Sequence, residues 1–169
     1  MGFSVSWIAR AGTSTEELVR TSGRKLTGDR DDFMDVGWYL LELPSAQKPW
    51  VLLIADGSDN FLELEEKHAL ALSSGGNETL YFLCSDTVMA TCLVCYRDAA
   101  PAWAIHYSCE AGAPMLQGEV PLLAKRQIAE SAEPEDLYEV TAELALALVG
   151  FRHDCEPETE DEEPFQLLA

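Results

Sequence analysis

Apolar and polar residues alternate at the start of the chain. Residues 3–7 place Phe, Val and Trp between serines, a pattern that predicts a strand with one buried face. Residues 13–23 predict a helix, with Thr13 or Ser14 as its N-cap, two acids in its first turn and Gly23 at its end. The chain is therefore expected to begin with a strand followed by a helix.

Two apolar, aromatic-rich runs come next. Residues 36–44 (VGWYLLELP) and 50–57 (WVLLIADG) predict neighbouring strands joined by a proline-bounded turn. Residues 60–72 then carry apolar side chains at helical spacing, and Asn60 is placed to cap a helix. A glycine-containing loop at residues 73–77 is expected to end that helix.

The second half of the chain predicts an antiparallel meander followed by helices. Four apolar segments within residues 79–120 are joined by connections too short for parallel crossovers. Helices are expected at residues 121–131 and 135–150. The order of elements predicts an α+β fold, a largely antiparallel sheet with helices packed mainly on one face. Residues 1–154 are expected to form a single domain, and residues 155–169, called the tail below, an acidic extension with an apolar end.

Five cysteines at irregular spacing indicate reduced thiols in a cytoplasmic protein rather than a disulfide framework. They are Cys84, Cys92, Cys95, Cys109 and Cys155. Cys92 and Cys95 form a C-x-x-C pair within an apolar run. Because side chains three residues apart in a strand point to opposite faces, this pair is not expected to share a zinc ion or close a disulfide. No spacing of cysteines and histidines predicts a metal site.

The charge of the chain is strongly negative and unevenly distributed. Thirty acids against eleven bases give a net charge of −19, of which residues 154–163 contribute −7. Residues 1–30 instead hold five bases and three acids. Such a field repels nucleic acid and anionic membranes and favours encounter with a basic protein. The alternative to a basic partner is that the high negative charge serves only to keep the protein soluble.

The tail combines a run of carboxylates with apolar residues at its end. The candidate binding residues are Glu158, Glu160, Asp161, Glu162, Glu163, Phe165, Leu167 and Leu168. A Phe-x-Leu-Leu segment behind such a run can dock into an apolar groove with a basic rim, either on a partner or on this chain's own basic N-terminal segment.

Five stretches of the sequence stand out as landmarks: FSVSWIA at residues 3–9, Gly-Trp-Tyr at 37–39, Val-Met at 88–89, AWAIHYSCEAG at 102–112 and GFRHD at 150–154. Together they resemble the landmarks of a family of uncharacterised bacterial proteins that has no assigned activity. This chain departs from the family pattern at two places. CSDTVMA stands at residues 84–90, where the family has acidic residues and a histidine before Val-Met, and Tyr107 and Ser108 stand where a His-Asp pair follows. If those polar groups form a site, this chain lacks part of it.

The sequence shows no nucleophile elbow, phosphate-binding loop or other catalytic signature, and no cofactor or catalytic residue is assigned. GFRHD is interpreted as a helix end, with Gly150 in the left-handed conformation and Phe151 packed back onto the helix. An enzyme would need a pocket on the open face of the sheet, and its candidate lining residues are Trp103, His106, Tyr107 and His153.

Two functional hypotheses follow from the sequence. The first is an intracellular, non-enzymatic binding protein with a basic protein partner, in concrete form an immunity or antitoxin-type inhibitor of a basic bacterial toxin. The second is a small hydrolase or ligand-binding enzyme with a pocket near His106 and His153. A homodimer that uses exposed strand edges or the tail is an alternative to both.

Overall fold

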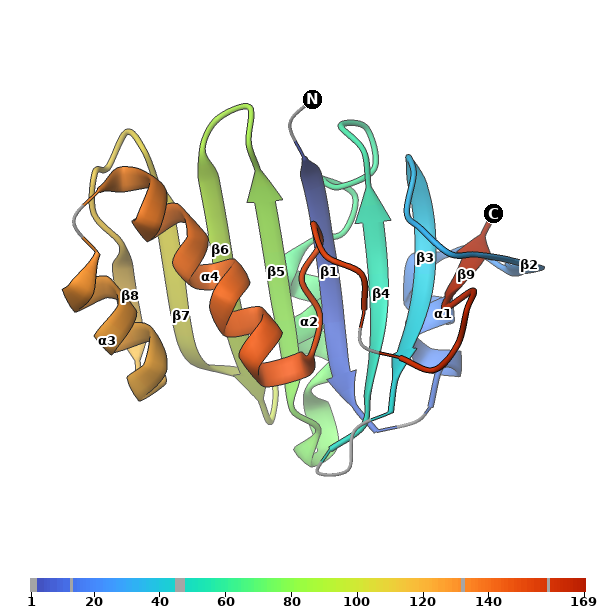
Figure 1. The fold of residues 1–169 in the computed structure, drawn as a ribbon. Coiled ribbons are helices and arrows are strands. Elements are labelled where there is room, and N and C mark those ends of the chain that lie inside the picture. The colour runs from blue at the N-terminus through green and yellow to red at the C-terminus, as the bar shows by residue number, and fades with distance from the viewer. Residues whose placement is uncertain (1–2, 13, 45–47, 132, 158) are drawn as a thin grey trace.

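One antiparallel sheet of nine strands forms the centre of the molecule (Figure 1). The structure is a computed structural model that describes residues 3–12, 14–44, 48–131, 133–157 and 159–169. The strands are β1 (Ser4–Ala11), β2 (Leu26–Asp31), β3 (Gly37–Leu43), β4 (Trp50–Asp56), β5 (Thr79–Ser85), β6 (Ala90–Arg97), β7 (Ala100–Ser108), β8 (Met115–Gly118) and β9 (Phe165–Leu168). Their order across the sheet is β2-β9-β3-β4-β1-β5-β6-β7-β8, so the last strand of the chain lies between two early ones.

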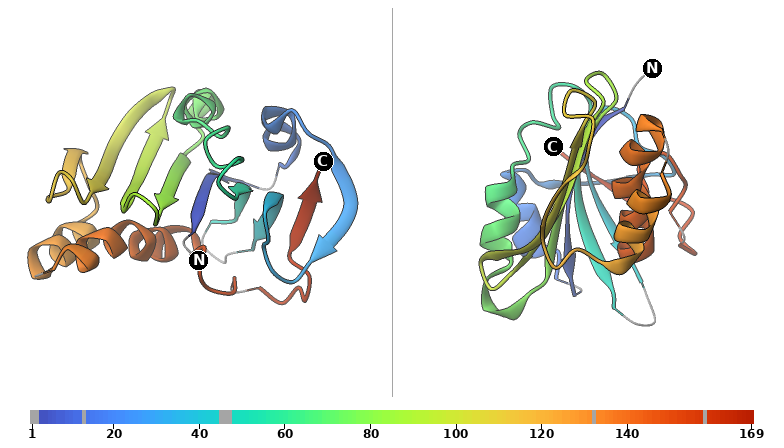
Figure 2. Two further views of the ribbon diagram at one scale, coloured as in Figure 1. Left: turned by 90° about the horizontal axis from the view of Figure 1, so that it is seen from above. Right: turned by 90° about the vertical axis from the view of Figure 1, so that its left-hand side faces the viewer.

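Helices cover both faces of the sheet, as the end-on view in Figure 2 shows. One face, called the α4 face, carries α3 (Leu122–Glu130) and α4 (Pro134–Val149). The other, called the α2 face, carries α1 (Glu16–Ser22) and α2 (Glu66–Leu72). The α+β class and the antiparallel sheet are confirmed, but the expectation of helices mainly on one face is wrong. The central strand β4 is buried along nearly its whole length, and a strand without polar alternation needs cover on both sides.

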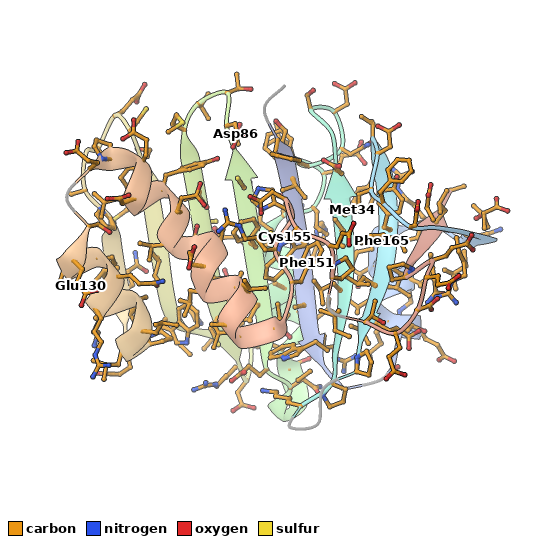
Figure 3. The ribbon with its side chains drawn as sticks, viewed as in Figure 1. Met34, Asp86, Glu130, Phe151, Cys155 and Phe165 are labelled. Carbon is orange, nitrogen blue, oxygen red and sulfur yellow. The ribbon has the colours of Figure 1, made fainter. Side chains whose placement is uncertain are left out.

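Successive residues of the central strands supply two separate cores. In β1, Trp7 belongs to the core under α4, whereas Ile8 belongs to the core under α1 and α2. The indole of Trp7 stacks on Phe82 with ring centroids 5.0 Å apart and meets the edge of Phe151 at 6.3 Å. Phe151 is fully buried, and Figure 3 shows it on the same side of the sheet as α4. The segment after α4 therefore belongs to the core rather than to a loose linker.

Both predicted helix-ending glycines are confirmed. Gly23 after α1 and Gly150 after α4 have φ values of 67° and 78°, the left-handed conformation in which glycine avoids a steric penalty. The predicted start of the second helix is wrong, because α2 begins at Glu66 and the amide of Asn60 donates instead to the Asp56 carbonyl in a preceding turn. The N-cap of α1 is Thr15, and Thr13 lies outside the described residues.

The sequence pattern did not predict β2 and β9. β2 is exposed along nearly all of its length and has the polar sequence LTGDRD. β9 has only four residues. Neither strand has the apolar alternation that would identify it locally. β2 is defined by its pairing with β9, and β9 by its pairing with both β2 and β3.

Candidate functional site

The tail returns to the sheet and adds a strand to it. β9 pairs with β3 on one side and with β2 on the other, and all of these pairings are antiparallel. Phe165 and Leu168 are buried, and Leu167 is half-buried. Figure 3 places Phe165 close to the sheet surface on the α4 face. The apolar end of the tail thus packs into the sheet of its own chain, and Phe165 and Leu168 are not free to anchor a partner.

The carboxylates of the tail remain at the surface. Glu160, Asp161, Glu162 and Glu163 are exposed, and Glu158 lies outside the described residues. Arg30 of β2 donates to a carboxylate oxygen of Asp161 at 2.5 Å and, through Nε, to the carbonyl oxygen of Glu163 at 2.8 Å. Arg30, from the basic N-terminal segment, therefore holds the acidic segment of the tail against β2, while the other carboxylates face solvent.

Helix α4 and the segment after it extend this negative surface. Residues 133–163 contain twelve acids and one base, Arg152. The guanidinium of Arg152 donates to Glu139 at 2.5 Å and to Glu143 at 3.1 Å, and its Nε donates to Asp154 at 2.6 Å. Because this cation is already paired with carboxylates, it leaves the surrounding surface strongly negative. We call the exposed carboxylates of residues 133–163 the acidic face.

A shallow groove of about 370 Å³ runs between α3 and α4 on this side. Its lining residues are Gln127, Glu130, Ser131, Asp136, Glu139, Val140 and Glu143. Arg152 pairs with two of its four carboxylates, Glu139 and Glu143. The other two suit a Lys or Arg side chain of a partner better than an anionic or apolar ligand.

A hollow of about 950 Å³ lies where the tail passes the ends of β3 and β4. Trp50 and Leu43 contribute to its wall together with Arg30 and Asp161. Two of its three carboxylates are already engaged within the chain, since Arg30 contacts Asp161 and the Gln166 amide donates to Glu42 at 3.1 Å. It is an open surface hollow without a set of convergent unpaired polar groups.

The four residues proposed to line an enzyme pocket do not come together. Trp103 lies on the α4 face, where Tyr107 also points because the two are four residues apart in the same strand. His106 faces the opposite side of the sheet. His153 lies on the α4 face against the rings of Phe3 and Phe82. The sheet therefore separates His106 from the other three, and the predicted single pocket is wrong.

His153 instead lies beside a thiol that the sequence reasoning missed. The Sγ atom of Cys84 is 3.6 Å from Nε2 of His153 and 2.9 Å from the hydroxyl of Tyr138. The Tyr138 hydroxyl donates to Asp86 at 2.5 Å, and the other Asp86 oxygen accepts the Phe3 backbone N–H at 2.8 Å. A cavity of about 130 Å³ adjoins these groups, close to the end of β5 where Figure 3 shows Asp86.

The protonation states of this cluster oppose nucleophilic catalysis. Burial, reinforced by the charge of Asp86, raises the pKa of Cys84 to about 12, so the sulfur is a neutral thiol at physiological pH. Burial also lowers the pKa of His153, and the imidazole is neutral as well. Burial opposes ionisation of Asp86 too, but hydrogen bonds from Tyr138 and the Phe3 N–H outweigh it and lower that pKa. The cluster connects β1, β5 and α4 to the end of GFRHD, which is a structural role.

Cys84 and Tyr107 lie in one row of the sheet. Cys84 is paired with Thr91, and Thr91 is paired with Tyr107, so these three side chains stand side by side on the α4 face. The Tyr107 hydroxyl is buried without a hydrogen-bond partner among the described residues. No local spacing could identify this cluster, because it joins residues 84–86, 138 and 153 from separate elements.

Comparisons with models of known families, with curated proteins and with solved structures find no match for this chain. Among the described residues no helix is long and apolar enough to cross a membrane.

Proposed function

We propose that this chain is an acidic protein-binding module of the cytoplasm that occupies a basic protein partner, in its most concrete form an immunity or antitoxin-type inhibitor of a basic bacterial toxin. The observation that carries the proposal is the acidic face. Residues 133–163 contribute −11 of the net charge of −19, since twelve acids are offset by one base. A patch of this sign accelerates encounter with a basic surface and rejects nucleic acid.

The arrangement of charges in space adds support. The acidic face lies on the α4 side of the sheet, whereas Arg20 and Arg24 accompany α1 on the other side. The groove between α3 and α4 would receive basic side chains. The exposed leucines Leu146 and Leu148 of α4 would supply apolar contact beside the carboxylates. A bound partner would thus contact α4 and the carboxylates of the tail together.

Five free cysteines, three of them buried, support the cytoplasmic assignment, since a reducing compartment preserves thiols. Membership in the uncharacterised bacterial family remains part of the same proposal. It rests on the landmarks at residues 3–9, 37–39 and 150–154.

The test compares two variants of equal net charge. The first converts three acids of the acidic face to amides: Glu135→Gln, Glu160→Gln and Glu162→Gln. The second converts three exposed acids elsewhere: Asp32→Asn, Asp59→Asn and Asp98→Asn. Each protein is used to capture partners from native lysate at low salt, and a retained protein is purified and its affinity measured at rising salt.

We expect the acidic-face variant to weaken binding at least about ten-fold and to flatten its salt dependence, while the control variant binds like the unmodified chain. An affinity that does not change between 50 and 500 mM salt, or that falls equally in both variants, would contradict a specific acidic interface. Substitutions are preferred to removal of the tail, because truncation would also delete β9 from the sheet.

One observation favours a second candidate, the small hydrolase, now centred on His153 alone. Cys84 lies 3.6 Å from His153 at the edge of a cavity, as a thiol nucleophile and its base would. A thiolate would be needed, and the raised pKa of Cys84 opposes it. Rapid alkylation of Cys84 in the folded protein at neutral pH would favour this enzyme, and slow alkylation would favour the binding protein.

A further inference from the structure

Three side chains with metal-binding atoms converge on the α2 face, apart from the acidic face. They are Glu66 at the start of α2, Cys92 of β6 and His106 of β7. Their candidate ligand atoms, a carboxylate oxygen, a thiol sulfur and an imidazole nitrogen, all lie within 4.8 Å of one another. The thiol is buried, the imidazole half-buried and the carboxylate exposed, so the group is open to solvent on one side.

The fold brings these residues together through strand register. Cys92 and His106 are direct partners in the antiparallel pair β6 and β7, and directly opposed residues point to the same face. α2 packs over β5 and β6 on that face and places its first residue, Glu66, above the pair. The neighbouring Cys95 belongs to the core of the opposite face. The C-x-x-C pair is therefore split between the faces, as the sequence predicted, and Cys92 is left with other partners.

We propose that Glu66, Cys92 and His106 bind a zinc ion. Thiolate, imidazole and carboxylate are the three ligand types that zinc takes in proteins, and three protein ligands with an open fourth position is a common arrangement. Magnesium and calcium prefer all-oxygen sites, so the sulfur and nitrogen donors select against them. The sequence motifs for zinc do not contain this set, because its members come from three elements.

The geometry needs only a small adjustment to hold the ion. Zinc bond lengths of about 2.0–2.3 Å at tetrahedral angles place ligand atoms roughly 3.4–3.6 Å apart. The atoms here are no more than 4.8 Å apart, so rotations of the half-buried imidazole and the exposed carboxylate can close the gap. The imidazole of His106 makes no hydrogen bond with any described residue that would have to be broken first. The Cys92 thiol transfers its proton to solvent when it becomes a ligand.

Tyr96 is the positioning residue of the site. Its hydroxyl donates to Glu66 at 2.5 Å, and it lies on the same strand as Cys92. This hydrogen bond restrains the carboxylate of Glu66, as outer-shell partners of zinc ligands commonly do.

The experiment uses the full chain in a background from which the two exposed thiols are removed by Cys109→Ser and Cys155→Ser. Zinc content is measured after dialysis, and zinc affinity by competition with a chromophoric chelator. Cobalt(II) then replaces zinc, because a cobalt–thiolate bond gives a charge-transfer absorption. The test variants are Cys92→Ser, His106→Ala and Glu66→Gln, and a circular dichroism spectrum checks that each remains folded.

Matched controls make the same types of substitution at nearby residues that are not proposed ligands. Cys95→Ser alters the thiol on the other face, and Glu65→Gln alters the adjacent exposed carboxylate. Tyr96→Phe tests the positioning hydrogen bond and is expected to weaken zinc binding about ten-fold.

We expect one zinc per chain and a cobalt–thiolate band that Cys92→Ser abolishes and Cys95→Ser preserves. His106→Ala and Glu66→Gln should weaken zinc binding by more than the roughly 10- to 100-fold loss typical of an outer-shell partner. Absence of bound zinc in the background protein, or zinc binding that persists unchanged in the three test variants, would overturn the proposal. Because Glu66→Gln and His106→Ala alter partly exposed side chains, they keep the test decisive if the buried Cys92→Ser variant does not fold.

Discussion

The contribution of the tail to stability is best tested at Phe165. Its side chain is 3% exposed, and its ring lies 5.9 Å from that of Tyr39 and 6.5 Å from that of Phe151. Replacing a buried phenylalanine by alanine removes its transfer free energy and leaves a cavity, at a combined cost of about 3–5 kcal/mol. Phe165→Ala is therefore expected to lose a large part of a total stability of about 5–15 kcal/mol.

The matched control is Phe33→Ala, since Phe33 is 60% exposed. A surface substitution of this kind changes the free energy of unfolding by about 0.5 kcal/mol or less. Urea unfolding followed by tryptophan fluorescence measures both variants. With a urea dependence of about 2 kcal/mol per M, Phe165→Ala should lower the midpoint by roughly 2 M, and Phe33→Ala should hardly change it. A loss below about 1 kcal/mol, or equal losses in both variants, would refute the placement of the tail within the core.

Three other features of the structure give further predictions. Of the five thiols, only the exposed Cys109 and Cys155 are expected to react with a thiol reagent in the folded protein, with the remaining three reacting after unfolding. Gly118→Ala should destabilise the fold by more than about 1 kcal/mol relative to Gly112→Ala, measured by thermal unfolding. Both glycines have positive φ, but a Cβ at Gly118 would lie 2.2 Å from a backbone carbonyl oxygen, whereas one at Gly112 meets nothing within 4 Å. Burial lowers the pKa of His153, so the folded chain binds fewer protons than the unfolded chain in mildly acidic solution. The free energy of unfolding should therefore fall as pH drops below about 6.5, with a slope of up to about 1.4 kcal/mol per pH unit. Urea unfolding at several pH values measures this slope, which His153→Phe is expected to remove.

The sequence predicted the elements that have a strong local pattern. Most strands and the last two helices follow from apolar runs, short connections and glycine stops. The sequence also contained the signal for helices on both faces of the sheet. Residues 50–55 are apolar without interruption, and a strand of this kind must be buried on both faces. A one-sided sheet would instead show polar residues at every second position.

The sites were harder to predict because they depend on contacts between distant parts of the chain. The cluster at Cys84 joins residues 54 and 69 positions away, and nothing in the local sequence of Tyr138 or His153 indicates this contact. The Cys92–His106 pair lies within one hairpin, β6 and β7, but the turn alone does not predict it. A register drawn straight through the turn at residues 98–99 would place Ile105, not His106, opposite Cys92. A bulge in this hairpin shifts the pairing by one residue and brings His106 opposite Cys92 instead.

The two proposed sites can be separated experimentally because adjacent residues of one strand serve opposite faces. In β6, Thr91 contacts Thr141 of α4 at 2.5 Å, whereas the next residue, Cys92, joins His106 on the α2 face. The sheet thus stands between the zinc ligands and the acidic face, and a side chain can change on one side without altering the surface of the other. Loss of zinc through His106→Ala is therefore expected to leave the salt dependence of partner binding unchanged. Conversely, the variant that neutralises the acidic face is expected to retain one zinc per chain.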